Sequence, residues 1–166
     1  MKNLSKKGLA SLRGRSGFTL VEMLMVVAII AVLAITVFSA INPSKRIKNA
    51  KDDRRLVDID SLLTAVHSYT IDNKGSLPSG LSTGMVEKQL GTGSSGCNIS
   101  SGGCSVGGSS DCVDLSTSLV DYLRFIPQDP DGTAVLTKYS IVVTSNGMVT
   151  IKACGQEGGS NLWISR

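Results

Sequence analysis

An apolar run near the N-terminus constrains the fold of this chain more than any other feature. Phe18 to Ile41 covers 24 residues, and a helix of about 20 residues crosses the hydrocarbon core of a bilayer. No charged residue occurs from Met23 to Ile41. A secretory signal peptide is the alternative, but its apolar region is usually about 7–15 residues long. We therefore predict a helix that spans the membrane and is retained.

Charge is unevenly distributed around this run. Residues 1–17 carry five basic side chains and no acidic one, whereas the rest of the chain carries 12 basic and 13 acidic side chains. A basic flank predicts that the N-terminus stays in the cytoplasm and that everything after Asn42 lies outside it. The formal net charge of +4 therefore belongs to the N-terminal segment, and it gives no support for nucleic-acid binding.

Glu22 places a carboxylate at the entrance of the apolar run, where a charge is costly unless it has a partner. The surrounding residues read RGRSGFTLVEM, a basic leader that ends in Gly17 and is followed by Phe18, with the acid as the fifth residue from that aromatic. This pattern resembles the processing signal of the type IV pilin and type II secretion pseudopilin family, and the resemblance covers about Met1 to Pro78. It implies cleavage between Gly17 and Phe18 by a prepilin peptidase and N-methylation of Phe18. It also implies that Glu22 pairs with the Phe18 amine of a neighbouring subunit during assembly.

Beyond the membrane the helix is expected to continue, with a disturbance at Asn42-Pro43 because proline lacks an N–H and clashes with the preceding turn. Helical spacing of apolar residues then resumes, and Asn73-Lys74-Gly75 supplies a C-terminal stop. The predicted apolar stripe of this second half consists of Leu56, Ile59, Leu63, Val66 and Thr70.

A small globular head is expected to cover this stripe. Val113 to Ile126 has the spacing of a short helix. Tyr139 to Thr144 and Met148 to Cys154 are β-branched runs around Asn146-Gly147, which predicts a type I′ hairpin. Because two strands alone are marginal, we expect a third strand at Thr133 to Thr137 or at Leu162 to Ser165.

The fold class is therefore predicted to be α+β, a long N-terminal helix packed on a small antiparallel sheet, which is also the pilin arrangement. We divide the chain into a leader (1–17), a transmembrane and assembly helix (18–41), its amphipathic continuation (42–75) and an extracellular head (76–166). The head contains a Gly/Ser-rich loop with cysteines (91–112) and the C-terminal β-hairpin.

Four cysteines lie in the part of the chain placed outside the cytoplasm. An even number there predicts two disulfides, for which three pairings are possible. We favour Cys97–Cys104, which would close the Gly/Ser-rich loop. Its companion would be Cys112–Cys154, which would tie the predicted short helix to the last strand of the hairpin.

Catalytic and metal-binding chemistry find little support in the sequence. His67 is the only histidine and the cysteines are expected to be oxidised, so no nucleophile and base can be paired, and we expect neither an enzyme nor a cofactor. Asp129 and Asp131 carry oxygens that suit calcium, as in some pseudopilins. A plain turn is the favoured interpretation of these two residues.

We therefore expect a structural subunit of a type IV pilus-like filament, cut after Gly17 and polymerised through its N-terminal helix. Its expected partners are further copies of itself, prepilin peptidase, the inner-membrane pilus assembly machinery and, before assembly, the cytoplasmic membrane. The assembled filament would lie on the cell surface. Two alternatives are a pseudopilin of a type II secretion system and a single-pass anchored binding module that never polymerises.

Overall fold

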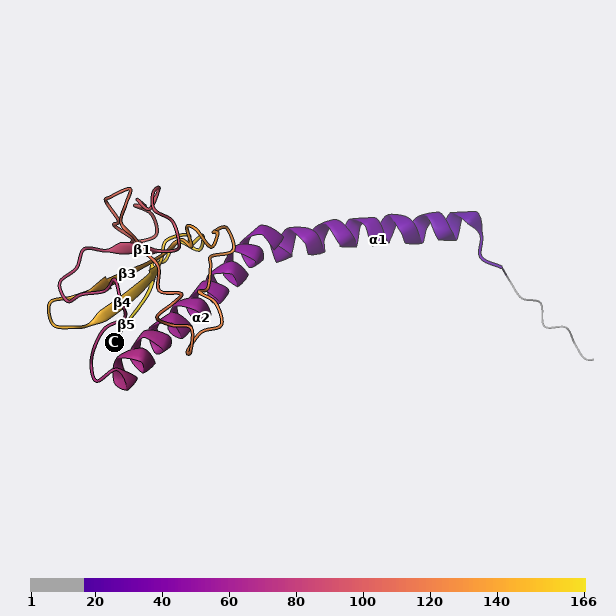
Figure 1. Cartoon of the computed structure of the whole chain (residues 1–166). Coiled ribbons are helices and arrows are strands. Elements are labelled where there is room, and N and C mark those ends of the chain that lie inside the picture. The colour runs from indigo at the N-terminus through magenta and orange to yellow at the C-terminus, as the bar shows by residue number, and fades with distance from the viewer. Residues whose placement is uncertain (1–16) are drawn as a thin grey trace, which may run out of the picture. The chain divides into compact units, whose positions relative to one another are not determined.

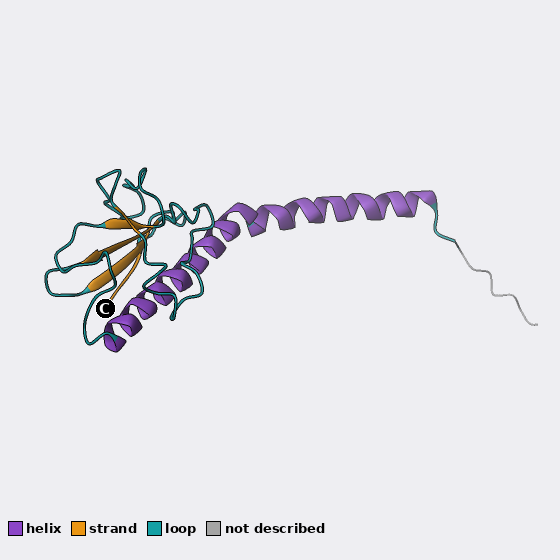
Figure 2. Ribbon diagram, viewed as in Figure 1, coloured by secondary structure: helices purple, strands orange, loops and turns teal. Residues whose placement is uncertain are grey.

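The computed structural model describes residues 17–166, which divide into two units: one ends at Asn42 and the other is Pro43–Arg166. The first unit contains α1 (Leu20–Ile41), and the second contains α2 (Pro43–Asp72) and a sheet of five strands (Figures 1 and 2). The strands are β1 (Lys88–Leu90), β2 (Cys112–Val113), β3 (Tyr139–Val143), β4 (Val149–Ala153) and β5 (Leu162–Ser165).

One residue, Asn42, separates the two helices and has a left-handed backbone conformation (φ 44°, ψ 72°). This confirms the predicted disturbance, because asparagine tolerates that region and Pro43 suits the first position of a new helix. The predicted stop after α2 is also confirmed. Gly75 has φ 88°, and its N–H donates to the carbonyl oxygen of Thr70 (2.7 Å) as in a Schellman motif.

The sheet has the strand order β2-β1-β3-β4-β5 and is mixed rather than purely antiparallel. The pairs β1/β3, β3/β4 and β4/β5 are antiparallel as expected, whereas β1 and β2 run parallel. Parallel neighbours need a crossover of about a dozen residues or more, and the Gly/Ser-rich loop between Leu90 and Cys112 provides it. Of the two candidates for the third strand, Leu162–Ser165 forms β5 and Thr133–Thr137 forms no strand.

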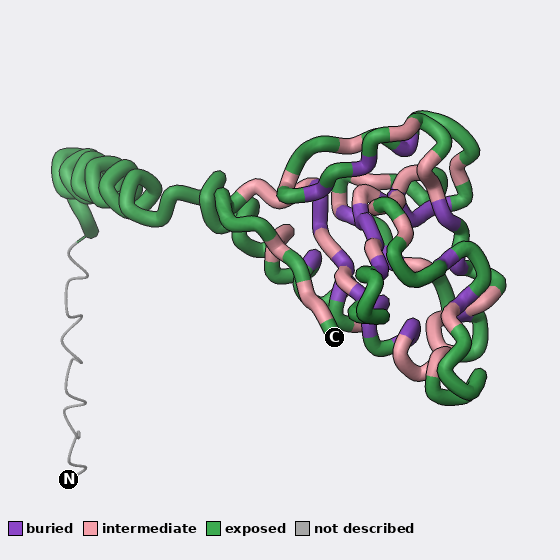
Figure 3. The backbone as a smooth tube through the Cα atoms, turned by 90° about the vertical axis from the view of Figure 1, so that its left-hand side faces the viewer, coloured by how far each residue is buried: buried purple, intermediate pink, exposed green. Residues whose placement is uncertain are grey.

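The hydrophobic core lies between α2 and the sheet, which confirms the expected α+β arrangement. Figure 3 shows that the buried positions gather in the second unit. Burying one large aliphatic side chain contributes about 1.5–3 kcal/mol relative to leaving it exposed. The stripe of α2 differs from the predicted one, because Leu56 is 46% exposed and Arg55 is fully buried. Core residues with no exposed area include Ile59, Leu62, Leu63, Leu90, Leu119, Tyr139, Ile141, Val143 and Ile151.

The helix expected at Val113 to Ile126 does not form. Val113 belongs to β2, and Asp114 Oδ1 accepts the N–H of Ser116 (2.8 Å) in an Asx turn. Asp, Ser and Thr compete with the helix for backbone hydrogen bonds. Two isolated turns, closed by the N–H of Leu119 to the carbonyl of Leu115 and the N–H of Leu123 to the carbonyl of Leu119, are therefore not propagated into a helix. Leu115 is nevertheless buried, so the apolar spacing serves the core without a helix.

The β3–β4 hairpin forms where predicted, but its turn is not type I′. Gly147 alone in the turn has a positive φ (82°), whereas a type I′ turn needs two such residues. The N–H of Gly147 donates to the carbonyl of Thr144 (3.0 Å), and the N–H of Thr144 donates to the carbonyl of Met148 (2.9 Å). The loop therefore has three residues, a type I turn followed by a left-handed glycine.

The favoured disulfide pairing is wrong. The structure has Cys97–Cys112 and Cys104–Cys154. The physical reason lies in the Gly/Ser-rich loop, where Ile99 and Val106 form an antiparallel bridge with N–H···O bonds of 3.1 and 3.0 Å. This small ribbon puts Cys97 at its base, near the chain that leads to Cys112, and Cys104 at its tip.

The tip of the ribbon folds over the sheet. Lys152 Nζ donates to the carbonyl of Gly103 (3.1 Å), and the Ser140 hydroxyl donates to Sγ of Cys104 (3.2 Å). Both contacts bring Cys104 to the end of β4, where Cys154 lies. The loop is therefore tied to the sheet by one cross-link at its base and another at its tip.

The two disulfides should differ in their effect on stability. They span sequence separations of 15 and 50 residues. By the chain-entropy relation the longer loop contributes about 1 kcal/mol more. We expect the paired change Cys104→Ser/Cys154→Ser to lower the urea midpoint more than Cys97→Ser/Cys112→Ser.

The pairing itself can be read from non-reduced peptides cut at Lys, at Arg and before Asp. Because Asp111 separates Cys112 from the other loop cysteines, the observed pairing gives three peptides joined together, and fragmentation then assigns each bond. A closed Cys97–Cys104 peptide beside a Cys112–Cys154 pair would contradict the structure.

Candidate functional site

The predicted cleavage site lies in an exposed segment outside any helix or strand. Gly17, Phe18 and Thr19 precede the first helical residue, Leu20, and Phe18 is 78% exposed. Thr19 has extended dihedrals (φ −78°, ψ 154°). Exposed non-helical backbone is the usual substrate of proteolysis, so the bond between Gly17 and Phe18 is sterically accessible to an enzyme. Cleavage there, and methylation of Phe18, stay predictions.

Glu22 forms a capping box with Thr19 at the start of α1. The backbone N–H and the hydroxyl of Thr19 donate to Glu22 Oε2 at 2.8 and 2.9 Å, and the Glu22 N–H donates to Thr19 Oγ1 at 3.2 Å. These bonds satisfy N–H groups that have no partner within the helix. A carboxylate in the first turn also interacts favourably with the helix dipole. Oε1 of Glu22 takes no part in the box.

Sequence reasoning missed Thr19, although the signal was present. The tetrapeptide Thr19-Leu-Val-Glu22 has the S/T-x-x-E pattern of a capping box, directly before an apolar run. The sequence prediction treated the carboxylate as lacking a cation and did not consider uncharged donors in its own chain. Glu22 thus has a structural role in α1 in addition to any role in assembly.

The apolar surface of α1 is unused within its own unit. Every residue of α1 is exposed, which Figure 3 shows as an unbroken exposed colour along the helix. The Thr36 hydroxyl donates to the carbonyl of Leu33 (2.8 Å), so this polar group needs no water. Among residues 17–166, the helical segment that begins at Leu20 is the one long and apolar enough to cross a membrane. Such a surface requires lipid or other apolar helices around it.

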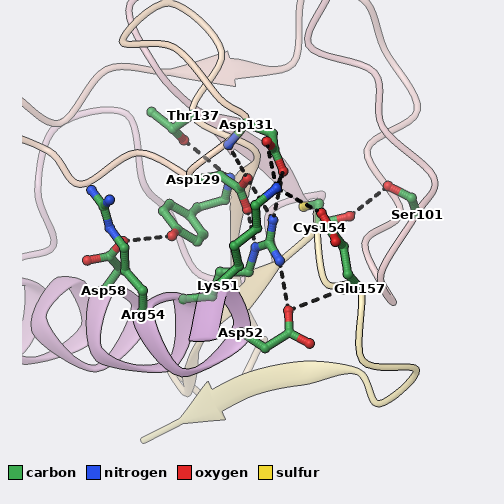
Figure 4. A network of polar contacts seen from close by, with 12 residues as sticks. Lys51, Asp52, Arg54, Asp58, Ser101, Asp129, Asp131, Thr137, Cys154 and Glu157 are labelled. Carbon is green, nitrogen blue, oxygen red and sulfur yellow. Dashed lines mark hydrogen bonds and ion pairs between the residues drawn. The ribbon is translucent and has the colours of Figure 1, made fainter. Parts of the chain in front are cut away.

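The calcium candidates Asp129 and Asp131 lie instead in a cluster of ion pairs centred on Arg55 (Figure 4). Arg55 Nε and Nη2 donate to the two oxygens of Asp129 at 2.5 and 3.0 Å, and both side chains have no exposed area. Arg55 Nη1 donates to Asp52 (2.7 Å) on the same helix. The bidentate geometry is that of a strong charge-assisted pair.

Lys51 extends this cluster to the C-terminal part of the chain. Its Nζ donates to Asp131 at 2.9 and 3.0 Å and to Glu157 at 3.1 Å. Asp52 accepts the backbone N–H groups of Glu157 (3.1 Å) and Gly158 (2.7 Å). The cluster therefore joins α2 to the turn before β3 and to the loop between β4 and β5.

Both aspartates are thus bonded to cations of the chain. The Lys51 ammonium bonded to Asp131 holds the pKa of that carboxyl below its ordinary value. In the part of the chain that the structure describes, no group of three or more His, Cys, Asp or Glu side chains is placed to hold a metal ion. The arrangement therefore favours a structural turn at Asp129-Pro130-Asp131.

Two tyrosines link the rest of the head to α2. Burial raises the pKa of Tyr139, and so does the hydrogen bond that its hydroxyl donates to Asp58 (2.8 Å). The hydrogen bond from the Tyr122 hydroxyl to Asp72 (2.7 Å) raises the pKa of Tyr122 to about 12. Both hydroxyls are therefore protonated donors near neutral pH.

Comparison with known proteins identifies one family signature. Residues 12–38 match the family model of the prokaryotic N-terminal methylation motif, which is the leader signature of type IV pilins and pseudopilins. This confirms the resemblance found at Gly17, Phe18 and Glu22. No curated protein and no solved structure matches the chain.

The buried pair Arg55–Asp129 gives a stability prediction. Arg55→Met leaves the Asp129 carboxylate buried without its partner, which costs about 3–5 kcal/mol, whereas Arg55→Met/Asp129→Leu removes both charges and should lose less. Urea unfolding of the full chain in detergent measures this.

A neighbouring arginine on α2 serves as the matched control. Arg54 is 62% exposed and its contact to Asp58 is 3.8 Å long, so Arg54→Met should change stability by less than about 0.5 kcal/mol. Equal losses for Arg54→Met and Arg55→Met would refute the role given to the buried pair.

Proposed function

We propose that this chain is a pilin, the structural subunit of a type IV pilus-like filament that polymerises through α1. The N-terminal motif supports a type IV pilin-like or pseudopilin-like protein and implies processing by prepilin peptidase and handling by an assembly machinery. The apolar helix and the leader motif fit a membrane-anchored precursor. The filament, its place on the cell surface and an N-terminus in the cytoplasm are our proposal.

The observation that carries the proposal is the surface of α1. It is apolar and exposed on every side, so it suits lipid before assembly and other α1 helices afterwards. In the filament we place the α1 helices in a central bundle, where water is excluded. A carboxylate in such a place costs several kcal/mol unless it is paired.

Cleavage after Gly17 would create the partner for this carboxylate. The new amine of Phe18 carries a positive charge that the uncut chain lacks at this position. The Thr19 bonds hold Oε2 of Glu22, and Oε1 is left for the amine of the next subunit. Glu22 would then fix the axial register of neighbouring subunits, because a bundle of apolar side chains alone specifies register weakly.

The head has a different part in this proposal. Two disulfides and the Arg55 cluster stabilise the head, which we place outside the cytoplasm, where disulfides persist. This favours a filament exposed to the surroundings over the pseudopilin alternative. We propose no catalytic role, since all four cysteines are in disulfides and His67 is the only histidine of the chain. A membrane-anchored module that never polymerises is the other alternative, and the following experiments distinguish it from a pilin.

The processing step predicts a defined mature mass. Intact mass spectrometry of the purified protein should show a chain that begins at Phe18 and carries one added methyl group. The change Gly17→Leu should leave the leader attached, because a peptidase pocket shaped for glycine has no space for a side chain there. A mature species that begins at Met1, or one cut near Ala40, would contradict the assignment.

Substitutions of Glu22 can separate the effect of its charge on assembly from the effect of helix capping. Glu22→Gln keeps an oxygen acceptor for Thr19 and so keeps the capping box, but it removes the charge. We expect Glu22→Gln and Glu22→Ala to reduce sheared surface filaments at least about tenfold, because an amine loses its partner in the apolar bundle.

Met23→Leu is the control for this experiment, because it changes the adjacent residue without changing charge. Subunit levels in the membrane, measured by immunoblot, should be equal in all variants. Normal filaments from Glu22→Gln would disprove the pairing. Stable membrane subunits without filaments, even from the unchanged protein, would favour the anchored module.

A further inference from the structure

We propose that the head carries two complementary surfaces, on opposite flanks of α2, by which it docks onto a second copy of this chain. The inference rests on the proposed function, since it concerns how heads meet once their α1 helices are assembled. The first surface, the knob, consists of Arg124 and Phe125. The second surface, the hollow, is lined by Leu56, Val57, Asp60 and Ile164.

The knob has the features of an interface anchor. Phe125 is 71% exposed and borders two cavities of 540 and 270 Å³, so partner atoms can reach it from more than one side. Its base is firm, because Ile126 packs against the core and Pro127 is buried. Exposed aromatic and arginine side chains that are fixed at their base are typical anchors of protein interfaces.

The hollow is suited to an aromatic ring. It has a volume of 370 Å³, whereas roughly 150 Å³ of apolar cavity is enough for benzene. Two of its walls are exposed aliphatic side chains, since Leu56 is 46% and Val57 is 68% exposed. Ile164 of β5 forms a third wall and packs against the core below it. The hollow thus leaves apolar surface uncovered that Phe125 could cover.

The charges of the two surfaces are also complementary. Arg124, the charged residue of the knob, is exposed, and among residues 17–166 it takes part in no ion pair. Asp60 lies at the rim of the hollow, and its contact to Arg166 is 3.9 Å long between side chains that are 56% and 60% exposed. Docking Phe125 into the hollow of another copy would bring Arg124 to Asp60. Opposite charges at an interface rim fix orientation and suppress wrong pairings.

The position of the two surfaces identifies the partner as a second copy. Arg54 of α2 lines the cavity beside Phe125, whereas Leu56, Val57 and Asp60 line the hollow. At 3.6 residues per turn these positions fall on either side of the buried stripe that contains Ile59. A knob on one flank and its receptor on the other make a head-to-tail contact, which propagates into an open helical array when the rotation does not close a ring.

The contact is too small to act alone. Stable interfaces bury about 1,200–2,000 Å² in total, and the knob and the hollow comprise only six residues. Assembly of the α1 helices would hold two heads at a high effective concentration, at which even a weak contact is occupied. The docking would therefore set how heads are arranged within a filament rather than drive its formation from free subunits.

Photocross-linking in the full chain tests the docking directly. We place p-benzoylphenylalanine, an aromatic photoreactive residue, at position 125 and irradiate intact filaments. The expected product is a dimer of this chain in which position 125 is joined to the segment Leu56–Asp60 or to Ile164. Val120 is the control position, because it is 62% exposed in the same segment but lines neither the knob's cavities nor the hollow.

Charge reversal gives an independent readout. Arg124→Glu and Asp60→Arg should each lower filament yield or shear resistance by roughly tenfold, and Arg124→Glu/Asp60→Arg should recover most of the loss. Both positions are exposed, and equal thermal melting of the variants would show that the head is intact.

The outcomes separate this inference from the proposed function. Filaments in which position 125 cross-links elsewhere, or in which the double reversal fails to recover the single losses, overturn the docking and leave the pilin proposal standing. If the unchanged chain forms no filaments and the photoreactive chain gives no dimer, both are overturned.

Discussion

The ion pairs of the Arg55 guanidinium are the interactions on which the arrangement of the head depends. It brings a fully buried positive charge into the stripe of α2 that otherwise consists of aliphatic side chains. A buried charge without a partner costs several kcal/mol of free energy. Asp129 and Asp52, from two different segments, supply the carboxylates that pair with Arg55. The turn before β3 is thereby fixed against the helix, and β3 is the central strand of the sheet.

α1 presents the opposite situation, because none of its side chains is buried in the part of the chain that the structure describes. N–H groups at its N-terminal end are satisfied by the Thr19–Glu22 capping box, and its surface is apolar on all sides. The start of the helix is thus capped, but its apolar surface is left uncovered within its own unit. Membrane insertion and the assembly that we propose would both supply such apolar surroundings, so the same segment would suit both.

Where the sequence was informative, the signal was local. The apolar run, the break at Asn42-Pro43, the stop at Gly75 and the β3–β4 hairpin each depend on a few neighbouring residues, and each was predicted at its observed place. The errors have a common cause in long-range contacts. Leu56 was placed in the apolar stripe by helical spacing, and the contact with the distant Asp129 shows why Arg55 is buried instead.

The same cause explains the wrong prediction of the disulfide pairing and of a helix that does not form. The pairing of Cys104 with Cys154 depends on a ribbon that folds over the sheet, and no spacing rule contains that information. Val113 was assigned to a helix because its parallel pairing to β1 could not be foreseen before the crossover was known. Of the candidate site, Glu22 was recognised from its pattern, whereas Thr19 was overlooked although its signal was as local as the others.

The location of Cys154 has a mechanical consequence. It lies one residue beyond the last residue of β4, so the cross-link to Cys104 closes a covalent ring that includes β2, β3 and β4. A pulling force on the head cannot extend the chain between these cysteines without breaking a sulfur–sulfur bond. β1 and β5 lie outside this ring and are held by hydrogen bonds and packing, so tension can detach either strand without breaking a covalent bond.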